Sequence, residues 1–503
     1  MKDRLIKILI LIGLFLCTLY PAIDSDLGWH LRYGEYFFKT GHVLYDNILS
    51  FVWPNYHWVQ ASWGYDLLVY QIYMHAGLIG ISIAAAATTV LVFFLITHPF
   101  SRLSIAQYLW LAYIFIAHSK PLYSAGFRSQ TPSTVMFAIA LIVMTQALTA
   151  PAPFSWTHEW RMYILPFLFL LWANLHGGFA LGLILFFIYW SAHGILLWMS
   201  RATKKHLTSV HPSNWAISGV FLLLSVATPL LNPWGAGIYG ETFKHVTNIN
   251  LTGIVEWMPL WTYPFEAIVL ALLTAATVIF SIRRKKPVDL PYICMLIVSA
   301  YLAESAIRFT IIFAVVFIYY WAQTLPHLKP PQWASTKWTE IISRAVIIGV
   351  IILDLFFVHR YMYIVPIPFW KLPTDWNSLC KLTWDCDEPL TALMRKDPPK
   401  GNGYHPYNWG GYLSWRVPQV KTFIDGRMAA WEDHGKTPAV IEGDWVNFQR
   451  SPVTFRELDS QYHFAWVIVP SQSYIADYMD ELVKDKLWER RYRDEFYSYY
   501  VKK

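Results

Sequence analysis

Three polar side chains follow the first apolar segment of the chain: Asp24, Asp26 and His30. Asp26 and His30 are four residues apart and would share one face of a helix. Two carboxylates and an imidazole close together at the end of an apolar segment suit a general base, a pair of metal ligands, or both. The alternative is structural, because Asp24 or Ser25 could cap the helix that follows. Capping explains one acid but not the second, so we predict that Asp24, Asp26 and His30 are catalytic.

Further polar residues stand in loops between later apolar segments. Each has an ordinary explanation alone: an arginine can snorkel, and Glu304 with Arg308 has the spacing of a helical ion pair. If the loops share one side of a membrane, these residues surround one cavity with acids, an imidazole and two guanidiniums. Arginine holds phosphate through paired donors, so we expect an anionic, phosphate-bearing substrate. The predicted binding residues are Arg128, Gln130, Asn174, His176, Glu256, Glu304 and Arg308.

Three tryptophans, Trp29, Trp58 and Trp63, lie close to these acids in the sequence. Aromatic residues make up 17% of the chain, and in membrane proteins most tryptophans and tyrosines lie at the two interfaces. A ring face beside an active site can also pack against the C–H groups of a sugar. Trp29, Trp58 and Trp63 are therefore candidates for sugar stacking.

The composition identifies the class of protein. The chain has 503 residues, of which 55% are hydrophobic and 15% charged, with a formal net charge of +7. Soluble proteins carry about 25% charged residues, so a soluble multidomain enzyme is excluded. No basic run interleaved with polar residues indicates nucleic-acid binding. Because a bilayer needs about 20 apolar residues per helix, the sequence predicts eleven spans, near residues 5–23, 76–97, 103–118, 133–149, 161–174, 178–199, 215–231, 265–282, 289–303, 308–324 and 342–358.

Charge asymmetry predicts the orientation of these spans. Lys and Arg in short loops mark the cytoplasmic side, and every strong basic cluster falls there if the N-terminus is cytoplasmic. The first span does not end in a small-x-small cleavage site, so we expect it to be retained rather than removed as a signal peptide. The spans at 161–174 and 289–303 are short and could be broken helices. The loop 24–75 then faces outward and carries an interfacial helix, and the C-terminal part of the chain is also outside.

The chain changes character after Trp370, where charge rises and apolar runs shorten. We predict strands at 412–415, 420–424, 464–469 and 496–501, and helices near 387–396 and 473–485. This alternation indicates a small α/β domain, giving a membrane domain at 1–358 and an extracytoplasmic domain at 359–503. Cys380 and Cys386 would lie in an oxidising compartment, so we predict a disulfide between them.

Several short motifs occur in a specific order along nearly the whole chain. They are Asp24-x-Asp26 at the end of the first span, Asp26-x-x-Trp29-His30, Arg128-x-Gln130, Asn174-x-His176-Gly177-Gly178, Glu256-Trp257, Asn408-Trp409-Gly410-Gly411-Tyr412 and Phe423-Ile424-Asp425-Gly426-Arg427. This set resembles the GT-C superfamily of integral-membrane glycosyltransferases, and within it a largely uncharacterised bacterial group. The expected fold is a GT-C-like bundle of about eleven transmembrane helices with a C-terminal extracytoplasmic α/β domain, in the bacterial inner membrane.

The resemblance implies transfer of a sugar from a polyprenyl-phosphate carrier to an acceptor outside the cytoplasm, such as a glycan, lipid or protein of the cell envelope. In such enzymes a carboxylate of the first loop acts as a base or helps to hold a divalent cation, Mg²⁺ or Mn²⁺. Asp24 and Asp26 match that acidic motif, and Arg128 and Arg308 are phosphate contacts by position.

Two other functions fit the composition. A transporter or flippase of lipid-linked saccharides would place charges near mid-membrane, whereas the polar groups here are biased to one side. A non-catalytic envelope scaffold would depend on the outer domain and not on Asp24 or Asp26.

Overall fold

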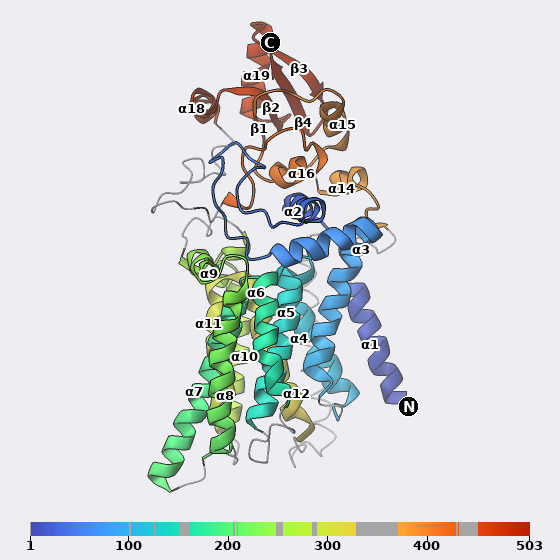
Figure 1. Cartoon of the computed structure of the whole chain (residues 1–503). Helices are drawn as coiled ribbons and strands as arrows, with labels where there is room; N and C mark the ends of the chain where they lie inside the picture. Colours follow the sequence, from blue (N-terminus) through green and yellow to red (C-terminus); the bar gives the residue numbers. More distant parts are fainter. Residues whose placement is uncertain are drawn as a thin grey trace.

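A computed structural model describes residues 2–99, 102–124, 126–149, 160–204, 207–208, 210–247, 255–283, 289–327, 371–383, 385–428, 431 and 451–503. It has two parts, a bundle of long helices and a smaller α/β unit stacked on one end of it (Figure 1). The N-terminal end of the first helix lies at the opposite end of the bundle from the C-terminal unit. Which end faces the cytoplasm stays a prediction from the charges.

The chain before the C-terminal unit contains twelve described α-helices. They are α1 (Lys2–Thr18), α2 (Leu27–Thr40), α3 (Trp63–Thr97), α4 (Ile105–Tyr123), α5 (Gln130–Leu148), α6 (Ile164–Leu175), α7 (Phe179–Thr203), α8 (Pro212–Ala227), α9 (Gly237–Thr247), α10 (Pro264–Arg283), α11 (Leu290–Ser305) and α12 (Thr310–Thr324). Helices cover ten of the eleven predicted spans, and the eleventh, 342–358, lies outside the described residues. Among described helices, six are long and apolar enough to cross a membrane. The count of eleven spans therefore stays a prediction.

Helix α3 changes direction at Gly77, which has φ 60° and ψ −157°. A residue with a side chain rarely adopts that conformation, whereas glycine does so at little cost. The first part of α3 lies across the end of the bundle and the second part runs into it (Figure 1). The predicted span at 76–97 begins at this kink, so the preceding residues, including Trp63 and Asp66, lie at the bundle's end beside α2.

The C-terminal unit consists of α14 (Trp376–Thr383), α15 (Glu388–Lys396), β1 (Asn402–Tyr404), α16 (Trp409–Arg416), α18 (Pro452–Tyr462), β2 (Phe464–Pro470), α19 (Tyr474–Lys484), β3 (Trp488–Arg493) and β4 (Tyr497–Lys502). Its strands form one sheet in the order β1-β2-β4-β3, with β1 and β2 parallel and the other two pairs antiparallel. The strands predicted at 464–469 and 496–501 and the helices near 387–396 and 473–485 are confirmed.

Two of the predicted strands are wrong. Residues 412–415 belong to helix α16, and 420–424 form no strand beyond a single bridge from Thr422 to Ser50. Most of α16, from Trp409 to Ser414, is buried on all sides between α2 and the C-terminal core. An element buried all round lacks the alternation between apolar and polar positions that distinguishes a short helix from a strand.

The two parts of the molecule share a hydrophobic core. Leu27 and Tyr65, from α2 and α3, pack in one cluster with Trp376 and Leu413 of the C-terminal unit. Helices α2 and α16 approach closely at Gly28, where an ideal Cβ would overlap the carbonyl oxygen of Gly411. The C-terminal unit is thereby held directly against the segment that carries Asp24 and Asp26.

Candidate active site

Five of the predicted residues meet at the end of the bundle that faces the C-terminal unit, with Arg128 at their centre. Its Nε lies 3.2 Å from Oδ2 of Asp24, and its Nη2 lies 3.8 Å from Oδ2 of Asp26. Its Nη1 donates to Oε2 of Glu256 at 2.6 Å. Asp24 and Asp26 precede α2, Arg128 precedes α5, and Glu256 follows α9. Residues from three separate loops are therefore joined by one guanidinium.

A second guanidinium, that of Arg308, extends the cluster. Its Nη1 lies 3.5 Å from Oε1 of Glu256, and its Cζ lies 4.2 Å from the ring centroid of Trp257. Glu256 therefore bridges Arg308 and Arg128. Arg308 and Glu304 were both predicted to bind substrate, and their spacing allowed an ion pair between them as the ordinary alternative. The Glu304 carboxylate has no ion-pair partner among the residues that the structure describes.

The acids of the cluster differ in their pKa values. Burial would raise the pKa of Glu256, but Arg128 and Arg308 outweigh it and lower that pKa to about 2. Burial, and then the negative charge of Asp24, raise the pKa of Asp26 to about 7 against the opposing effect of Arg128. A general base works best with a pKa near the operating pH. Burial also raises the pKa of Asp24, so the two neighbouring aspartates, and not Glu256, are the acids of this cluster suited to exchange a proton.

The side chain of Asp26 is held by a tryptophan. Asp26 occupies the N-cap position of α2 but makes no side-chain capping bond. Its Oδ1 accepts a hydrogen bond from Nε1 of Trp29 at 3.0 Å, and its backbone N–H donates to Oδ1 of Asp24 at 3.2 Å. Helix capping therefore does not account for this acid.

The side chain of His30 is paired with Asp66 of α3, and not with Asp24 or Asp26 as the sequence suggested. Its Nδ1 is 2.5 Å from Oδ1 of Asp66, whose Oδ2 accepts from Nε2 of Gln60 at 2.9 Å. The imidazole is buried, and burial followed by the charges of Arg128 and Arg427 holds the pKa of His30 below its usual range. The hydrogen bond that joins His30 to Asp26 is between backbone groups, from the N–H of His30 to the carbonyl of Asp26. His30 supports α2 against α3, and sequence reasoning missed Asp66 and Gln60.

Asn174, in the last turn of α6, and His176, which follows that helix, have different roles. Asn174 accepts from Nε1 of Trp63 at 2.7 Å and donates to the carbonyl of Leu170 at 2.7 Å, so its amide holds helices together. Nδ1 of His176 accepts from the backbone N–H of Gly178 at 3.0 Å. The proton of the neutral ring is then on Nε2. Burial, and then the charge of Arg308, lower the pKa of His176 to about 3.

The remaining predicted residues are placed as follows. Gln130 begins α5, and its side-chain amide makes no hydrogen bond to the described residues. Trp29 and Trp58 pack edge to face at 5.7 Å and are only 5% and 7% exposed. Trp63 is half-buried and bonded to Asn174. Trp29 and Trp58, expected to offer ring faces to a sugar, are enclosed in an aromatic core in this structure.

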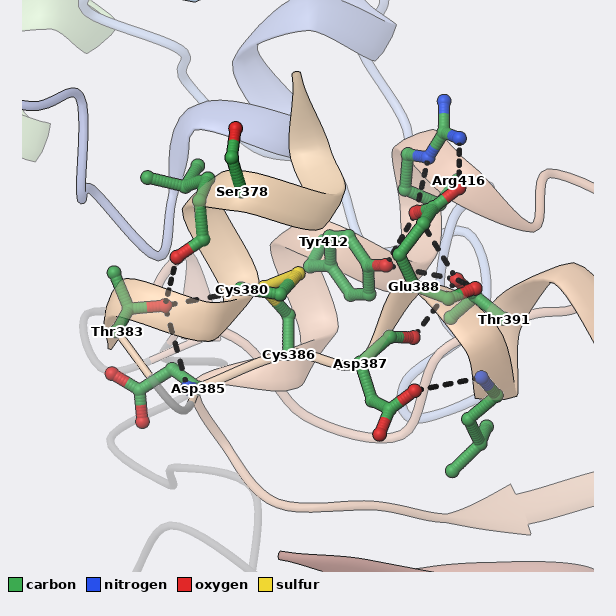
Figure 2. Close-up of a disulfide and its surroundings, with 12 residues drawn as sticks. Ser378, Cys380, Thr383, Asp385, Cys386, Asp387, Glu388, Thr391, Tyr412 and Arg416 are labelled. Carbon is green, nitrogen blue, oxygen red and sulfur yellow. Dashed lines mark hydrogen bonds and ion pairs between the residues drawn. A yellow bond between two sulfur atoms is a disulfide. The ribbon is translucent and has the colours of Figure 1, made fainter. Parts of the chain in front are cut away.

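A pocket lies beside Asp24, between the segment 23–28 and the C-terminal unit. Its lining includes Trp376, Cys386 and Tyr412. The structure joins Cys380 to Cys386 by a disulfide, the pairing expected from the sequence, and this links α14 to the start of α15 (Figure 2). The disulfide thus fixes one wall of a pocket that reaches an acid of the site.

The donor set does not fit a divalent cation as it is arranged. Asp24 and Asp26 both face the guanidinium of Arg128, and Oδ1 of Asp26 accepts from Trp29. Across the described part of the chain, no group of three or more His, Cys, Asp or Glu side chains is arranged to hold a metal ion. The two carboxylates would have to leave Arg128 to bind a cation together.

Comparison with known proteins shows which solved structures share this fold. No protein-family model and no curated protein matches the chain. Solved structures do match, and they give the chain the fold of the GT-C membrane glycosyltransferases, which confirms the resemblance in the sequence.

Particular structures can be named. The apo oligosaccharyltransferase of Archaeoglobus fulgidus matches with a TM-score of 0.54 at 10% identity, over 92% of this chain and 69% of that chain. The same enzyme tethered to an acceptor peptide containing the NVT sequon matches with a TM-score of 0.56 at 12% identity, over the same shares of both chains. ArnT from Cupriavidus metallidurans, bound to undecaprenyl phosphate, gives a TM-score of 0.49 at 12% identity, over 99% and 97% of the two chains.

Proposed function

We propose that this protein is a membrane glycosyltransferase that transfers a sugar from a polyprenyl-phosphate-linked donor to an acceptor outside the cytoplasm. The acceptor would be a glycan, lipid or protein of the cell envelope. The protein would lie in the bacterial inner membrane, with its N-terminus in the cytoplasm and its C-terminal unit outside. The GT-C fold supports this proposal at the level of architecture.

One observation carries the proposal, namely the ionic cluster of Asp24, Asp26, Arg128, Glu256 and Arg308 at a single end of the bundle. A lipid-linked donor keeps its chain in the bilayer and its phosphate at the interface. The groups that act on it must then stand at the ends of the helices. A transporter would instead place charged groups along a path near mid-membrane.

The cluster supplies the two functions that the reaction requires. The acceptor must lose a proton as its oxygen or nitrogen bonds to the anomeric carbon, and the carboxylate of Asp26 would take that proton. The bond between the anomeric carbon and the phosphate oxygen breaks, and the lipid phosphate leaves with an added negative charge. Arg308, with the Nε2–H of the neutral His176, would stabilise that charge. Arg128 would hold Asp24 and Asp26 side by side, although burial outweighs it and raises the pKa of Asp24.

A requirement for Mg²⁺ or Mn²⁺ would need Asp24 and Asp26 to leave Arg128, and it is tested separately from the mechanism above. Arg128 occupies the position between Asp24 and Asp26 where a cation would bind. Assays with a chelator, followed by addition of each cation, test the requirement directly.

The decisive experiment supplies the purified protein with labelled polyprenyl-phosphate sugar and envelope acceptors. Asp26→Asn keeps the shape of the side chain but removes the base, and we expect the rate of transfer to fall about 100-fold or more. Asp46→Asn is the matched control, since Asp46 is an exposed acid of the same loop paired with His57. Its rate should equal that of the wild type.

Other results would reject the proposal that the protein is an enzyme. Movement of the lipid-linked sugar across vesicles, without transfer and unaffected by Asp26→Asn, would indicate a flippase. Absence of transfer, together with binding to an envelope protein that is lost only on deletion of residues 371–503, would indicate a scaffold.

A further inference from the structure

The C-terminal unit places a backbone segment directly against the carboxylate of Asp26. This segment is Thr422–Arg427, and the residue in contact is Gly426. An ideal Cβ at Gly426 would overlap Oδ1 of Asp26 and lie 2.7 Å from its Cγ and its Oδ2. Only a residue without a side chain allows this approach. The charge of Asp425 also contributes to the raised pKa of Asp26.

The segment is held from the C-terminal side by a buried histidine. Nε2 of His405 accepts from the backbone N–H of Phe423 at 2.7 Å, and its Nδ1 lies 2.9 Å from the carbonyl oxygen of Pro406. Since a backbone N–H can only donate, the ring must carry its proton on Nδ1. Burial lowers the pKa of His405 to about 4, so the imidazole stays neutral and keeps its acceptor near neutral pH.

The segment is also held from the first loop of the membrane part. The backbone N–H of Thr422 donates to the carbonyl of Leu49 at 2.8 Å, and the N–H of Phe51 donates to the carbonyl of Thr422 at 3.2 Å. Oγ of Ser50 donates to the carbonyl of Phe423 at 2.8 Å. Residues more than 370 positions apart in the sequence are thus paired backbone to backbone.

A closed ion pair holds the far end of the segment. Nε and Nη2 of Arg427 donate to the two carboxylate oxygens of Asp425 at 2.8 and 2.6 Å. Nη1 donates to the hydroxyl of Tyr33, on α2, at 3.3 Å. Both charged side chains are at most 1% exposed. Gly426 lies between the two paired residues, so its backbone has little freedom to move away from Asp26.

We propose that Thr422–Arg427 is a positioning element for Asp26, and that Gly426 fixes where the carboxylate can lie. This inference rests on the proposed function of Asp26 as the base. The segment touches neither donor nor acceptor in this account. It makes the C-terminal unit part of the catalytic apparatus rather than a separate binding module.

The test compares Gly426→Ala with the wild type and with Gly240→Ala. Gly240 lies in α9, and an added Cβ there would meet no atom within 4 Å. The first measurement is the pH dependence of carbodiimide coupling at Asp26, followed by mass spectrometry, because only the protonated carboxyl reacts. It reports the state of Asp26 without any assay of transfer. The groups that share its environment are Asp24, Tyr65, Arg128, Tyr407 and Asp425.

We expect the coupling midpoint to shift by about half a pH unit or more in Gly426→Ala, because the added methyl group displaces the carboxylate and changes its solvation. The kcat should fall about tenfold or more, while the KM for the donor stays the same. Gly240→Ala should match the wild type in both measurements. An unchanged midpoint and kcat in a folded Gly426→Ala protein would overturn the proposal, as would equal losses in the control.

Two safeguards keep the outcomes separate. If Gly426→Ala does not fold, Ser50→Ala removes one bond to Phe423 and should shift the midpoint and kcat by a smaller amount. A Ser50→Ala protein identical to the wild type would then count against the positioning element. Absence of transfer by the wild type would reject the proposed function, whereas the coupling midpoint would still decide whether Gly426 positions Asp26.

Discussion

Arg128 and Arg427 both pair with aspartate, but their surroundings differ. Arg427 grips one carboxylate with two parallel bonds, and neither partner is more than 1% exposed. Arg128 is shared among Asp24, Asp26 and Glu256, its contact with Asp26 is 3.8 Å long, and its side chain is 21% exposed. The guanidinium of Arg427 is paired with one carboxylate in the protein interior. The guanidinium of Arg128 belongs to a cluster that has more acids than arginines and is partly exposed to solvent.

The difference separates a structural ion pair from the cluster that we propose to be catalytic. A buried, bidentate pair resists change, because breaking it leaves an uncompensated charge in the interior. A partly exposed cluster of several charges can exchange partners when a substrate arrives, and its crowding shifts pKa values such as that of Asp26. Residue types alone do not distinguish the two cases, since both are built from arginine and aspartate.

The largest effect is expected from breaking the closed pair. Arg427→Met should destabilise the protein by about 3–5 kcal/mol, because Asp425 would remain charged and buried without its partner. Thermal unfolding in detergent measures the change. The control is Arg491→Met, which removes a surface ion pair with Asp397 and should cost less than about 1 kcal/mol. Similar losses of stability in the two variants would contradict the distinction between a buried and a surface ion pair.

A smaller effect is expected from a substitution in the open cluster, which is the ionic cluster of Asp24, Asp26, Arg128, Glu256 and Arg308. Among the described residues, Arg308 has one ion-pair contact, 3.5 Å to Glu256, and it packs on Trp257. It can therefore turn toward a phosphate more readily than Arg128. Arg308→Gln should lower kcat/KM for the lipid-linked donor about 10- to 100-fold, the range for a hydrogen bond to a charged group. Stability should change little.

The matched control for Arg308 is Arg490→Gln, a surface arginine of β3 paired with Asp480, which should transfer sugar at the wild-type rate. A normal kcat/KM in Arg308→Gln, with a large loss in Arg128→Gln, would assign the phosphate to Arg128 instead.

Much of the open cluster could be predicted from the sequence. The closed pair of Asp425 and Arg427 was noted only as part of the motif Phe423–Arg427, and its pairing was not predicted. Asp24, Arg128 and Arg308 stand at the ends of long apolar runs, and such runs fix which loops share a side. Arg427 follows no apolar span, and its partner Tyr33 is 394 positions away. A contact of that range depends on how the C-terminal unit docks, for which spacing gives no signal.

The fold shows the same division. Long helices were predictable because a span needs about 20 apolar residues, and β2 and β4 are apolar runs of ordinary strand length. Helix α16 was not, since Trp409 and Leu413 are buried on different sides of the same short element. Asp66 was missed because an acid in an amphipathic helix ordinarily faces water, whereas here it is buried against His30.

The pH dependence of sugar transfer is the prediction with the smallest effect on the rate at neutral pH. It tests the role of Asp26 as the base most directly. Asp26 must be ionised to accept a proton, so kcat/KM should rise with pH, about tenfold per unit below a midpoint near the pKa of about 7. The raised pKa of Asp26 has the opposite effect on the free energy of unfolding. Between the ordinary value of 3.8 and about 7 the folded protein keeps a proton that the unfolded chain releases. The contribution of Asp26 to stability therefore falls as pH rises.

Other titrating groups near Asp26 would give different profiles of kcat/KM against pH. The acid limb, which is the part of the profile where kcat/KM rises with pH, can therefore be assigned to one group. Glu256 and His176, with pKa values of about 2 and about 3, do not titrate in this range. Asp24→Asn removes a negative charge that raises the pKa of Asp26, and the limb should move toward acid in any activity that this variant retains. A limb near pH 4 in the wild type, or one that Asp24→Asn leaves in place, would show that the group that titrates is not Asp26 in the open cluster.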